Sequence, residues 1–536
     1  MKMRRLNCCV VALCLAALGS VPVFAAAGKP GPTEQAGDAF KQQRREAANR
    51  KRRVIFNNDG DEIVYECREA TLKALLDART TALAGTQVDS IFYCTWSSGM
   101  SLFTHDTKAG QVFDTREGRF APNMTRAMLD RGIDPLKAMV DFGKEHRMEV
   151  FWSYRMNDTH DGALTDYGPV MFRANKLKTE HPEYLMGDPK HLPKYGAWSA
   201  MNYGLPEVRE LAFRYVEEVC QNYDVDGVEL DFFRHPVFFK HNTAGAPCDD
   251  ADREQMTGLV RRIREMTEAV GRKRGRPILV AMRVPDSVEY SRAVGIDLEQ
   301  WLAGDLLDLL IVSSYLQLNA WEYSVQLGHK YGVKVYPSLD ESRVKDPDAR
   351  ALRMSPLAYR GRAMNVWNSG ADGVYIFNHF NPLSPVWREL GDPAQLQNMD
   401  KDYFASVRGV AGVAGSALPH SAFIKIATLN PASPIPLADG REAEVKFPIG
   451  DKVRAGDDAA GTTLTLRLRL KDLQRPEAAA VKMNGNSVPN GSLAKDWVEF
   501  KLDPKWVRQG ANEVTVTPAL QDKGSLTDLH LTVRHK

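Results

Sequence analysis

Between residues 53 and 385 the chain repeats one pattern: a short apolar run, a turn, and then a segment whose apolar residues recur every three or four positions. The short runs are typical of buried strands, and the three-and-four spacing is typical of amphipathic helices. Strands that alternate with helices form a parallel sheet, and eight such units favour a closed (β/α)8 TIM barrel. The predicted strands are Val54–Asp59, Val88–Trp96, Glu149–Asn157, Gly227–Phe233, Ile278–Pro285, Leu307–Tyr315, Val333–Asp340 and Gly373–His379.

The pattern of apolar and polar residues changes after about residue 415. Short alternating stretches are separated there by Gly, Asn, Asp and Pro, at Ala443–Phe447, Thr462–Leu468, Val498–Leu502, Asn512–Thr517 and Leu529–Val533. Such a pattern predicts a small all-β sandwich over residues 416–536, a candidate carbohydrate-binding or spacer module. Residues 386–415 are the expected connecting segment, partly helical.

The first 27 residues combine a basic start, an apolar core and a run of small residues, which is typical of a secretory signal peptide. We therefore expect a periplasmic or secreted protein, with a polar basic linker over residues 28–52. No other run approaches the ~20 apolar residues of a membrane span, so we expect no integral membrane segment after signal cleavage.

Composition narrows the function classes. The chain has 70 Lys and Arg against 68 Asp and Glu, so no basic field indicates a nucleic-acid partner. Outside the signal stretch the cysteines are Cys67, Cys94, Cys220 and Cys248, with no C-x-x-C pair, so a zinc ribbon is not expected. No G-x-G-x-x-G follows the first strand, and we expect no cofactor.

Alternation along the fourth strand predicts which side chains enter the barrel. Val228, Leu230 and Phe232 share one parity and should face the helices, so that Glu229 and Asp231 point inward. Other strands also end in inward polar residues, and active sites of such barrels lie at the carboxyl ends of the strands. The mouth would gather the acids Asp59, Glu229, Asp231, Asp286, Asp340 and Glu341, the arginines Arg155, Arg234 and Arg283, and the histidines His160, His235 and His379.

Paired carboxylates with flanking aromatic residues are the requirement of glycoside hydrolysis. Asp231 is the first catalytic candidate, as nucleophile or base, and Asp340 or Glu341 is its expected partner. A carbohydrate is the expected substrate. The substrate-binding candidates are Trp96, Arg155, Asn157, Glu229, Arg234, His235, Arg283, Tyr315 and His379.

Two other hypotheses stay open. Phe232 and Phe233, two apolar residues directly after Asp231, favour a non-catalytic glycan-binding protein on a degenerate barrel. His105, His160 and His379 allow a metal-dependent hydrolase, but no H-x-H or H-E-x-x-H spacing supports this, and we expect no metal.

The fourth-strand region also resembles a known family. Residues 201–236, MNYGLPEVRELAFRYVEEVCQNYDVDGVELDFFRHP, resemble the segment leading through strand four of family 10 glycosylhydrolase-like proteins, and residues 151–161 and 370–378 fit their third and eighth strands. The resemblance covers about residues 50–385. It implies a (β/α)8 barrel acting on polysaccharide or oligosaccharide, with Asp231 matching the strand-four aspartate. Phe232 departs from the second aspartate frequent in that family, and Phe233 excludes a chitinase-type glutamate at its position.

Overall fold

The computed structural model describes residues 32–313, 316–340, 344–406, 420–438, 440–453, 461–489 and 491–535. The predicted signal peptide, Tyr315 and Glu341 lie outside these ranges. The chain forms two compact units, residues 1–42 and 43–536, and the second contains both the barrel and the carboxyl-terminal sheets. Within the described ranges, no helix combines the length and the apolar character needed to cross a bilayer.

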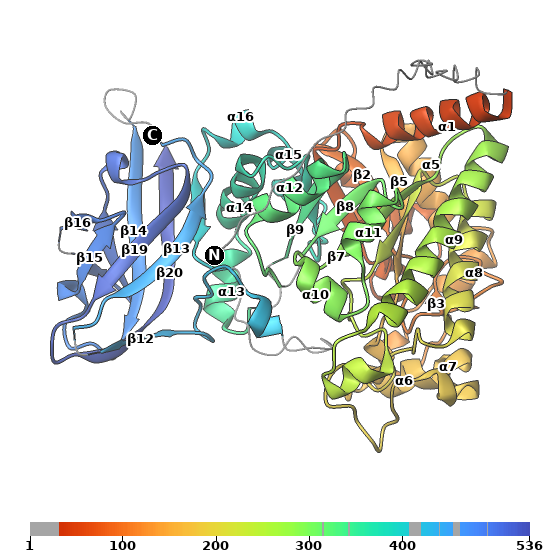
Figure 1. Ribbon diagram of the computed structural model, residues 1–536, viewed down its shortest axis with the longest axis horizontal. Coiled ribbons are helices and arrows are strands. Elements are labelled where there is room, and N and C mark those ends of the chain that lie inside the picture. Colours follow the sequence, from red (N-terminus) through yellow and green to blue (C-terminus); the bar gives the residue numbers. More distant parts are fainter. Residues whose placement is uncertain are drawn as a thin grey trace, which may run out of the picture. The chain divides into compact units, whose positions relative to one another are not determined.

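Eight parallel strands close into a barrel in the order β1-β10-β9-β8-β7-β6-β5-β2. Five of them, β2, β5, β7, β8 and β9, are labelled in Figure 1. Each strand lies inside its predicted range, and the predicted (β/α)8 architecture is confirmed. The strands are β1 (Val54–Asn58), β2 (Val88–Tyr93), β5 (Glu149–Arg155), β6 (Gly227–Asp231), β7 (Leu279–Val284), β8 (Leu309–Val312), β9 (Lys334–Leu339) and β10 (Val374–Ile376).

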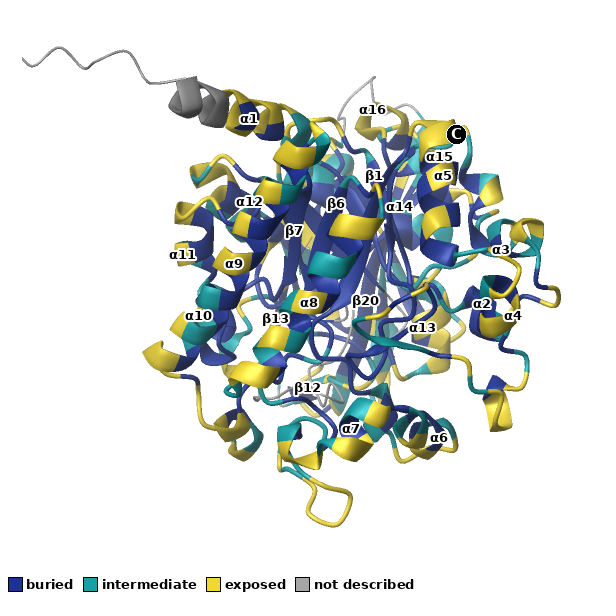
Figure 2. Ribbon diagram, turned by 90° about the vertical axis from the view of Figure 1, so that its right-hand side faces the viewer, coloured by how far each residue is buried: buried dark blue, intermediate teal, exposed yellow. Residues whose placement is uncertain are grey.

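Helices cover the barrel and turn one side to solvent, as the dark-blue strands inside partly yellow helices in Figure 2 show. Helix α9 begins at a capping box, in which Asp249 and Asp252 bond each other's backbone amides, and it ends at Gly275 with a φ of +74°. The larger helices of this layer are α3 (Leu72–Arg79), α5 (Pro135–His146), α8 (Pro206–Asn222), α9 (Asp250–Arg274), α10 (Val288–Ala293), α11 (Leu298–Ala303), α12 (Trp321–Lys330), α13 (Pro347–Arg353) and α14 (Pro356–Asn368).

Further helices and strands complete the region before the carboxyl-terminal sheets. The connection from β5 to β6 is the longest and contains α6 and α7 at the carboxyl-terminal face. The additional elements are α1 (Pro32–Ala48), α2 (Glu62–Tyr65), β3 (Leu102–Phe103), β4 (Gln111–Val112), α4 (Thr125–Leu129), α6 (Tyr167–Ala174), α7 (Lys176–Glu180), α15 (Val386–Glu389) and α16 (Pro393–Leu396).

The carboxyl-terminal region contains two antiparallel sheets, ordered β11-β20-β14-β18-β17, with β12 beside β20, and β13-β19-β15-β16. Strand β13 alternates buried and exposed residues throughout, which is the period of two seen in its sequence. The strands are β11 (Lys401–Phe404), β12 (Ile435–Ala438), β13 (Ala443–Ile449), β14 (Thr462–Lys471), β15 (Ala480–Met483), β16 (Asn486–Val488), β17 (Ser492–Ala494), β18 (Trp497–Lys501), β19 (Gly510–Thr517) and β20 (Lys523–His535). Strand β11 comes from the segment expected only to connect, and it pairs with β20.

A buried ion pair joins the barrel layer to these sheets. Arg353 of α13 donates two hydrogen bonds, of 2.7 and 2.8 Å, to the carboxylate of Asp528 on β20. Its Nε donates to the carbonyl of Ser406 at 3.0 Å, and its guanidinium lies 4.4 Å from the ring centre of Phe404. Both charged side chains are buried, so each depends on the other for its stability.

We predict that Arg353→Met lowers the free energy of unfolding by about 3–5 kcal/mol, because it leaves the Asp528 carboxylate buried without its partner. Urea denaturation measures the change. Arg126→Met is the matched control, since Arg126 pairs with Asp114 on the surface, and it should change stability by less than about 1 kcal/mol. If both substitutions change the free energy of unfolding equally, the buried Arg353–Asp528 pair contributes no more to stability than a surface pair.

Candidate active site

Glu229 lies on the barrel axis, as its parity predicts. Its Oε2 accepts hydrogen bonds from Ser153 Oγ of β5 at 2.5 Å and from Tyr375 OH of β10 at 3.1 Å. Strands β6 and β10 are four places apart in the eight-strand ring, so the contact with Tyr375 spans the barrel. Glu229 is therefore a deep group inside the barrel, below its mouth.

Asp231 lies two residues after Glu229 on β6, nearer the mouth, and its carboxylate is hydrogen-bonded by Arg283 and by two backbone amides. Arg283 of β7 donates to both carboxylate oxygens, from Nε at 3.0 Å and from Nη2 at 2.5 Å. The backbone amides of Phe233 and Arg234 each donate to Oδ1 at 3.0 Å. The Asp231 side chain is only 2% exposed. This arrangement anchors Arg283 and the start of the loop after β6, and it leaves little of the carboxylate open to a substrate.

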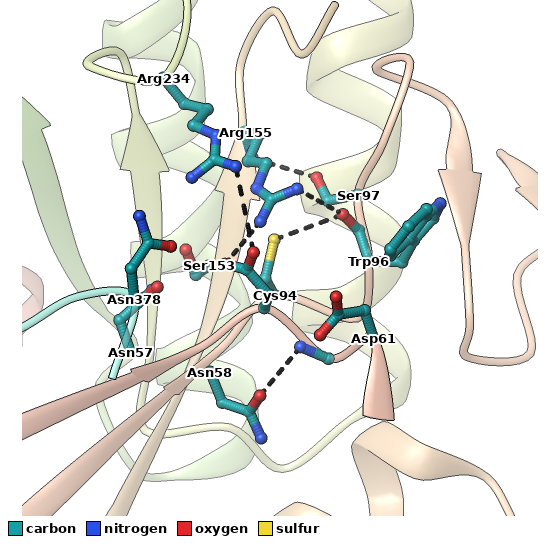
Figure 3. A network of polar contacts seen from close by, with 12 residues as sticks. Asn57, Asn58, Asp61, Cys94, Trp96, Ser97, Ser153, Arg155, Arg234 and Asn378 are labelled. Carbon is teal, nitrogen blue, oxygen red and sulfur yellow. Dashed lines mark hydrogen bonds and ion pairs between the residues drawn. The ribbon is translucent and has the colours of Figure 1, made fainter. Parts of the chain in front are cut away.

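Five polar side chains form a closed ring at the mouth: Asp59, Arg155, Asp158, His160 and Arg234, called the mouth ring below. Arg155 Nη2 lies 2.6 Å from Asp59 Oδ1, and its Nη1 lies 3.4 Å from Asp158 Oδ2. Asp158 Oδ2 also bonds His160 Nδ1 at 2.7 Å. Arg234 Nη2 completes the ring, 3.3 Å from His160 Nε2 and 4.0 Å from Asp59 Oδ2. Figure 3 shows the two guanidinium groups beside each other above Cys94.

The partners of the two histidines assign their protons. Arginine only donates, so His160 Nε2 accepts from Arg234 and the His160 proton lies on Nδ1, directed at Asp158. His235 Nδ1 accepts the backbone amide of Thr159 at 3.2 Å, so the His235 proton lies on Nε2.

The mouth and the barrel interior differ in charge. Burial raises the pKa of the Asp59 carboxyl, but Arg155 and Arg234 outweigh burial and hold this pKa below its ordinary value. Burial raises the pKa of Asp158, but the hydrogen bond from His160 and the charge of Arg155 outweigh burial and lower this pKa strongly. For Glu229, burial outweighs the attraction of Arg283 and raises the pKa to about 7. The mouth carboxylates are therefore ionised, whereas Glu229 is protonated in much of the population at neutral pH.

The residues of the site differ in how much of each side chain is exposed to water. Water reaches 12% of the Asp59 side chain, 25% of His160 and 14% of His235, whereas Asp158 is fully buried. Two cavities of about 540 Å³ lie apart from the mouth ring, one in the β5–β6 excursion against Trp198 and one between α12, α14 and the carboxyl-terminal sheets. Solvent therefore meets the ring mainly at Asp59 and His160, and it also reaches His235 beside the ring.

A strained turn after β2 supports Arg155. Thr95, Trp96 and Ser97 all have a positive φ, of 47°, 69° and 43°. Each such residue costs on the order of 1–3 kcal/mol, and strain of this kind clusters at functional sites. The turn directs the Trp96 carbonyl at Arg155 Nη1 and the Ser97 hydroxyl at the Arg155 amide, at 3.2 and 3.0 Å.

Two of the predicted substrate-binding residues, Trp96 and Asn157, use their side chains in contacts within the protein. The ring of Trp96 is buried against Phe113 and Tyr65, so it offers Arg155 a carbonyl in place of an open face. Asn157 hydrogen-bonds the backbone of Met201 through both ends of its side-chain amide, and it also donates to the carbonyl of Val237. Its side chain therefore links the two loops that contain these residues.

The expectation that His379 faces the barrel interior is wrong. Asn378 has a φ of +55°, which breaks the alternation one residue earlier. His379 consequently packs in the outer layer, with ring centres 5.2 Å from Tyr359 and 5.4 Å from Trp387, and burial lowers its pKa to about 4.

Asp340 follows β9, is buried, and lies next to Asn378. Asn378 Nδ2 donates to Asp340 Oδ2 at 3.3 Å. Asp340 also raises the pKa of Tyr359 on α14, adding to the larger effect of burial. Asp286, one of the acids expected at the mouth, accepts the backbone amides of Leu318 and Asn319 and so holds the loop after β8.

Sequence reasoning named Asp59 and His160 without ranking them, and it missed Asp158. The alternation of Asn57 and Asp59 on the first strand was the available signal for Asp59. Asp158 follows the end of β5, where strand parity no longer applies, so no pattern marked it.

The histidines at the mouth are poorly suited to a metal ion. Donor atoms of Asp158, His160 and His235 lie within 4.8 Å of one another. However, His160 Nδ1 carries a proton, His235 Nδ1 is taken by an amide, and Arg155 and Arg234 bring positive charge to the same place. The donor set therefore fits a hydrogen-bond network better than a cation.

We predict that Glu229→Gln removes part of the protein's pH-dependent stability. The pKa of Glu229 rises from 4.5 to about 7 on folding, so its contribution is complete below pH 4.5 and is lost as the pH rises through 7. The unfolding free energy of wild type should therefore fall by about 1–3 kcal/mol relative to Glu229→Gln between pH 5 and 8, measured by urea titration. Glu117→Gln, at an exposed glutamate, is the control and should leave the profile unchanged. Parallel profiles of wild type and Glu229→Gln would contradict the assignment.

Comparison with known proteins finds a similarity in the first half of the barrel. Residues 55–258 match the family model described as glycosyl hydrolase-like 10. The protein named glycosyl hydrolase YngK from Bacillus subtilis (strain 168) is 29% identical over 132 residues, which are 24% of this chain and 22% of that protein. The chain thus matches about a fifth of the length of this curated relative.

Similar solved structures are more distant. An α-L-fucosidase isoenzyme 2 from Paenibacillus thiaminolyticus is 15% identical, with 65% of this chain and 48% of that chain covered and a TM-score of 0.37. A variant of the α-galactosidase AgaA from Geobacillus stearothermophilus is 10% identical, covering 94% and 59%, with a TM-score of 0.36. The segment 55–258, which carries the whole mouth ring together with Glu229 and Asp231, thus matches the glycosyl hydrolase-like 10 family.

Proposed function

We propose that this protein is a glycoside hydrolase that cleaves a polysaccharide or oligosaccharide at the carboxyl-terminal mouth of its barrel. The mouth ring carries the proposal: the ends of β1, β5 and β6 supply an ionised carboxylate, Asp59, whose side chain is 12% exposed and lies between two arginines. All of these residues belong to the segment that matches the glycosyl hydrolase-like family.

Asp59 and Asp340 are the proposed catalytic pair. Strands β1 and β9 both neighbour β10, so their ends are separated by two strand spacings, roughly 9–10 Å. Inverting glycosidases hold their carboxyl groups about 6.5–9.5 Å apart, and this separation leaves room for a water molecule. Asn378, at the end of β10, lies between the two strands and bonds Asp340.

The ionised state of Asp59 suggests which member of the pair is the base and which is the acid. The lowered pKa of Asp59 keeps its carboxyl ionised, which is the form that a base needs to take a proton from the attacking water. Asp340, or Glu341 next to it, is the proposed acid that protonates the leaving oxygen. Arg155 keeps Asp59 ionised, and Asp158 and His160 hold Arg234 in place.

Asp231 has a positioning role in this proposal. Its carboxylate is saturated by Arg283 and by two amides, so it fixes the loop that bears Arg234 and His235. We also propose that the protein acts outside the cytoplasm, periplasmic or secreted, on the evidence of the signal-like first 27 residues.

We predict that Asp59→Asn lowers the rate of glycan hydrolysis at least ~100-fold, because the neutral amide cannot accept a proton from water. The measurement is release of reducing ends from a broad panel of polysaccharides and oligosaccharides, after circular dichroism has shown that the variant is folded. Asp114→Asn, which changes an Asp–Arg pair on the surface of the same domain, is the control and should keep full activity. Undiminished hydrolysis by Asp59→Asn would remove Asp59 from the mechanism. Glycan binding by wild type without any release of reducing ends would instead favour a non-catalytic glycan-binding protein.

For Asp231→Asn we predict a loss of stability of about 3–5 kcal/mol, because the Arg283 guanidinium stays buried without its counter-charge. The double variant Asp231→Asn with Arg283→Met should recover most of this loss in urea denaturation, since it removes both charges. A double variant no more stable than the single one would contradict the positioning role.

A further inference from the structure

A second cluster of ligand-type side chains lies in the loop between β6 and α9, apart from the mouth ring. It consists of His241, Cys248 and Asp252, whose ligand atoms all lie within 4.8 Å of one another. Cys248 and Asp252 are buried, while 42% of the His241 side chain is exposed and opens the cluster to solvent. The cluster takes no part in the proposed hydrolysis.

The surrounding contacts fix these groups in place. His241 Nε2 lies 2.5 Å from Asp252 Oδ2, and the thiol of Cys248 lies 3.3 Å from Asn242 Oδ1. The Asn242 amide nitrogen donates to the carbonyls of Ala246 and Ala293, which directs its oxygen at the sulfur. The Cys248 backbone is held as well, since its amide donates to the carbonyl of Ala293 at 2.9 Å. Three donor atoms, one sulfur, one nitrogen and one oxygen, therefore lie close together, and the Asn242 oxygen contacts the sulfur.

The chemistry of the donors favours a transition metal. The cluster offers a sulfur from Cys248, an imidazole nitrogen from His241 and a carboxylate oxygen from Asp252. A divalent ion would bind thiolate and carboxylate together and would neutralise both charges. Thiolate and imidazole ligands suit zinc and related ions, whereas calcium and magnesium need oxygen ligands.

The spacing also agrees with such an ion. Bond lengths of about 2.0–2.3 Å place the donors of a tetrahedral zinc shell roughly 3.3–3.8 Å apart. The 3.3 Å between Cys248 Sγ and Asn242 Oδ1 is already in this range. The His241–Asp252 contact needs to open by about an ångström, and His241 can make this movement because it is half-exposed.

The cluster contrasts with the histidines at the mouth. There, two guanidinium groups contact the candidate ligands directly. Here the neighbouring Arg253 is engaged elsewhere, with the carbonyl of Cys248 at 2.7 Å and with the carboxylate of Asp250. Its charge is thus partly balanced by a group outside the cluster.

We propose that His241, Cys248 and Asp252 form a site for a divalent transition-metal ion of the zinc class, with the Asn242 oxygen or a water molecule as fourth ligand. The ion would tie the middle of the β6–α9 loop to the first turn of α9. The same loop begins with Arg234 and His235, so the ion would have a structural role in holding the loop that supplies part of the mouth.

The experiment uses the full chain, stripped of metal with a chelator and then titrated with Zn²⁺ by calorimetry and with Co²⁺ by absorption. We expect one equivalent of Zn²⁺ to bind and to raise the unfolding temperature, and Co²⁺ to give the sulfur-to-metal charge-transfer band of a thiolate ligand. Cys248→Ser should abolish this band and weaken Zn²⁺ binding at least ~10-fold. Cys220→Ser, at a buried cysteine of α8, is the matched control and should change neither.

His241→Gln is a second variant, since a half-exposed side chain can be replaced without disturbing the fold, and it should weaken binding to a similar degree. Absence of Zn²⁺ binding to the wild-type chain would overturn the proposal. So would binding that survives both Cys248→Ser and His241→Gln, or binding that is lost in His160→Gln and therefore belongs to the mouth. None of these readouts depends on glycan hydrolysis, so failure here and failure of the proposed activity are separate results.

Discussion

The buried charge of Arg155 is the constraint on which the mouth of this barrel depends. A guanidinium enclosed by protein is tolerable only with carboxylates and carbonyls around it. Asp59, Asp158 and the Trp96 carbonyl supply them from three separate segments, the ends of β1 and β5 and the turn after β2. The ends of β1, β2 and β5 are therefore held in one arrangement by a single side chain.

This arrangement explains why strain is present beside it. The left-handed residues Thr95 to Ser97 cost free energy, and the turn is kept because it directs polar groups at Arg155. The same positive charge keeps Asp59 ionised in a place where burial alone would favour its neutral form. Structural stability and the chemistry proposed for Asp59 thus depend on the same contact.

Inside the barrel, burial has a larger effect on the pKa of a carboxyl group than the nearby arginine has. Glu229 has hydroxyl partners in Ser153 and Tyr375, and the charge of Arg283 is largely committed to Asp231. Desolvation therefore dominates, and the pKa of Glu229 rises to about 7. Two acids of similar chemistry, Asp59 and Glu229, differ in protonation because only Asp59 is paired directly with an arginine.

The carboxyl-terminal sheets are tied to the barrel layer by the same type of contact. Arg353 and Asp528 are 175 residues apart in the chain and form a buried, two-bond pair. Strand β11, from a segment that the sequence indicated only as a connection, is part of the sheet that contains Asp528. The arrangement of the two sheets as a sandwich remains a prediction.

The sequence by itself determined the eight strands and the inward direction of Glu229 and Asp231, because strand periodicity is a local property of the chain. It could not determine which inward groups pair, since partners such as Asp59 and Arg155 meet only when β1, β2 and β5 are aligned by barrel closure. It also failed where the alternation stops, at Asn378, whose backbone sends His379 outward. Asp158 and His160 follow β5, and only the tertiary structure brought them to Arg234, because loop residues have no period that predicts their direction.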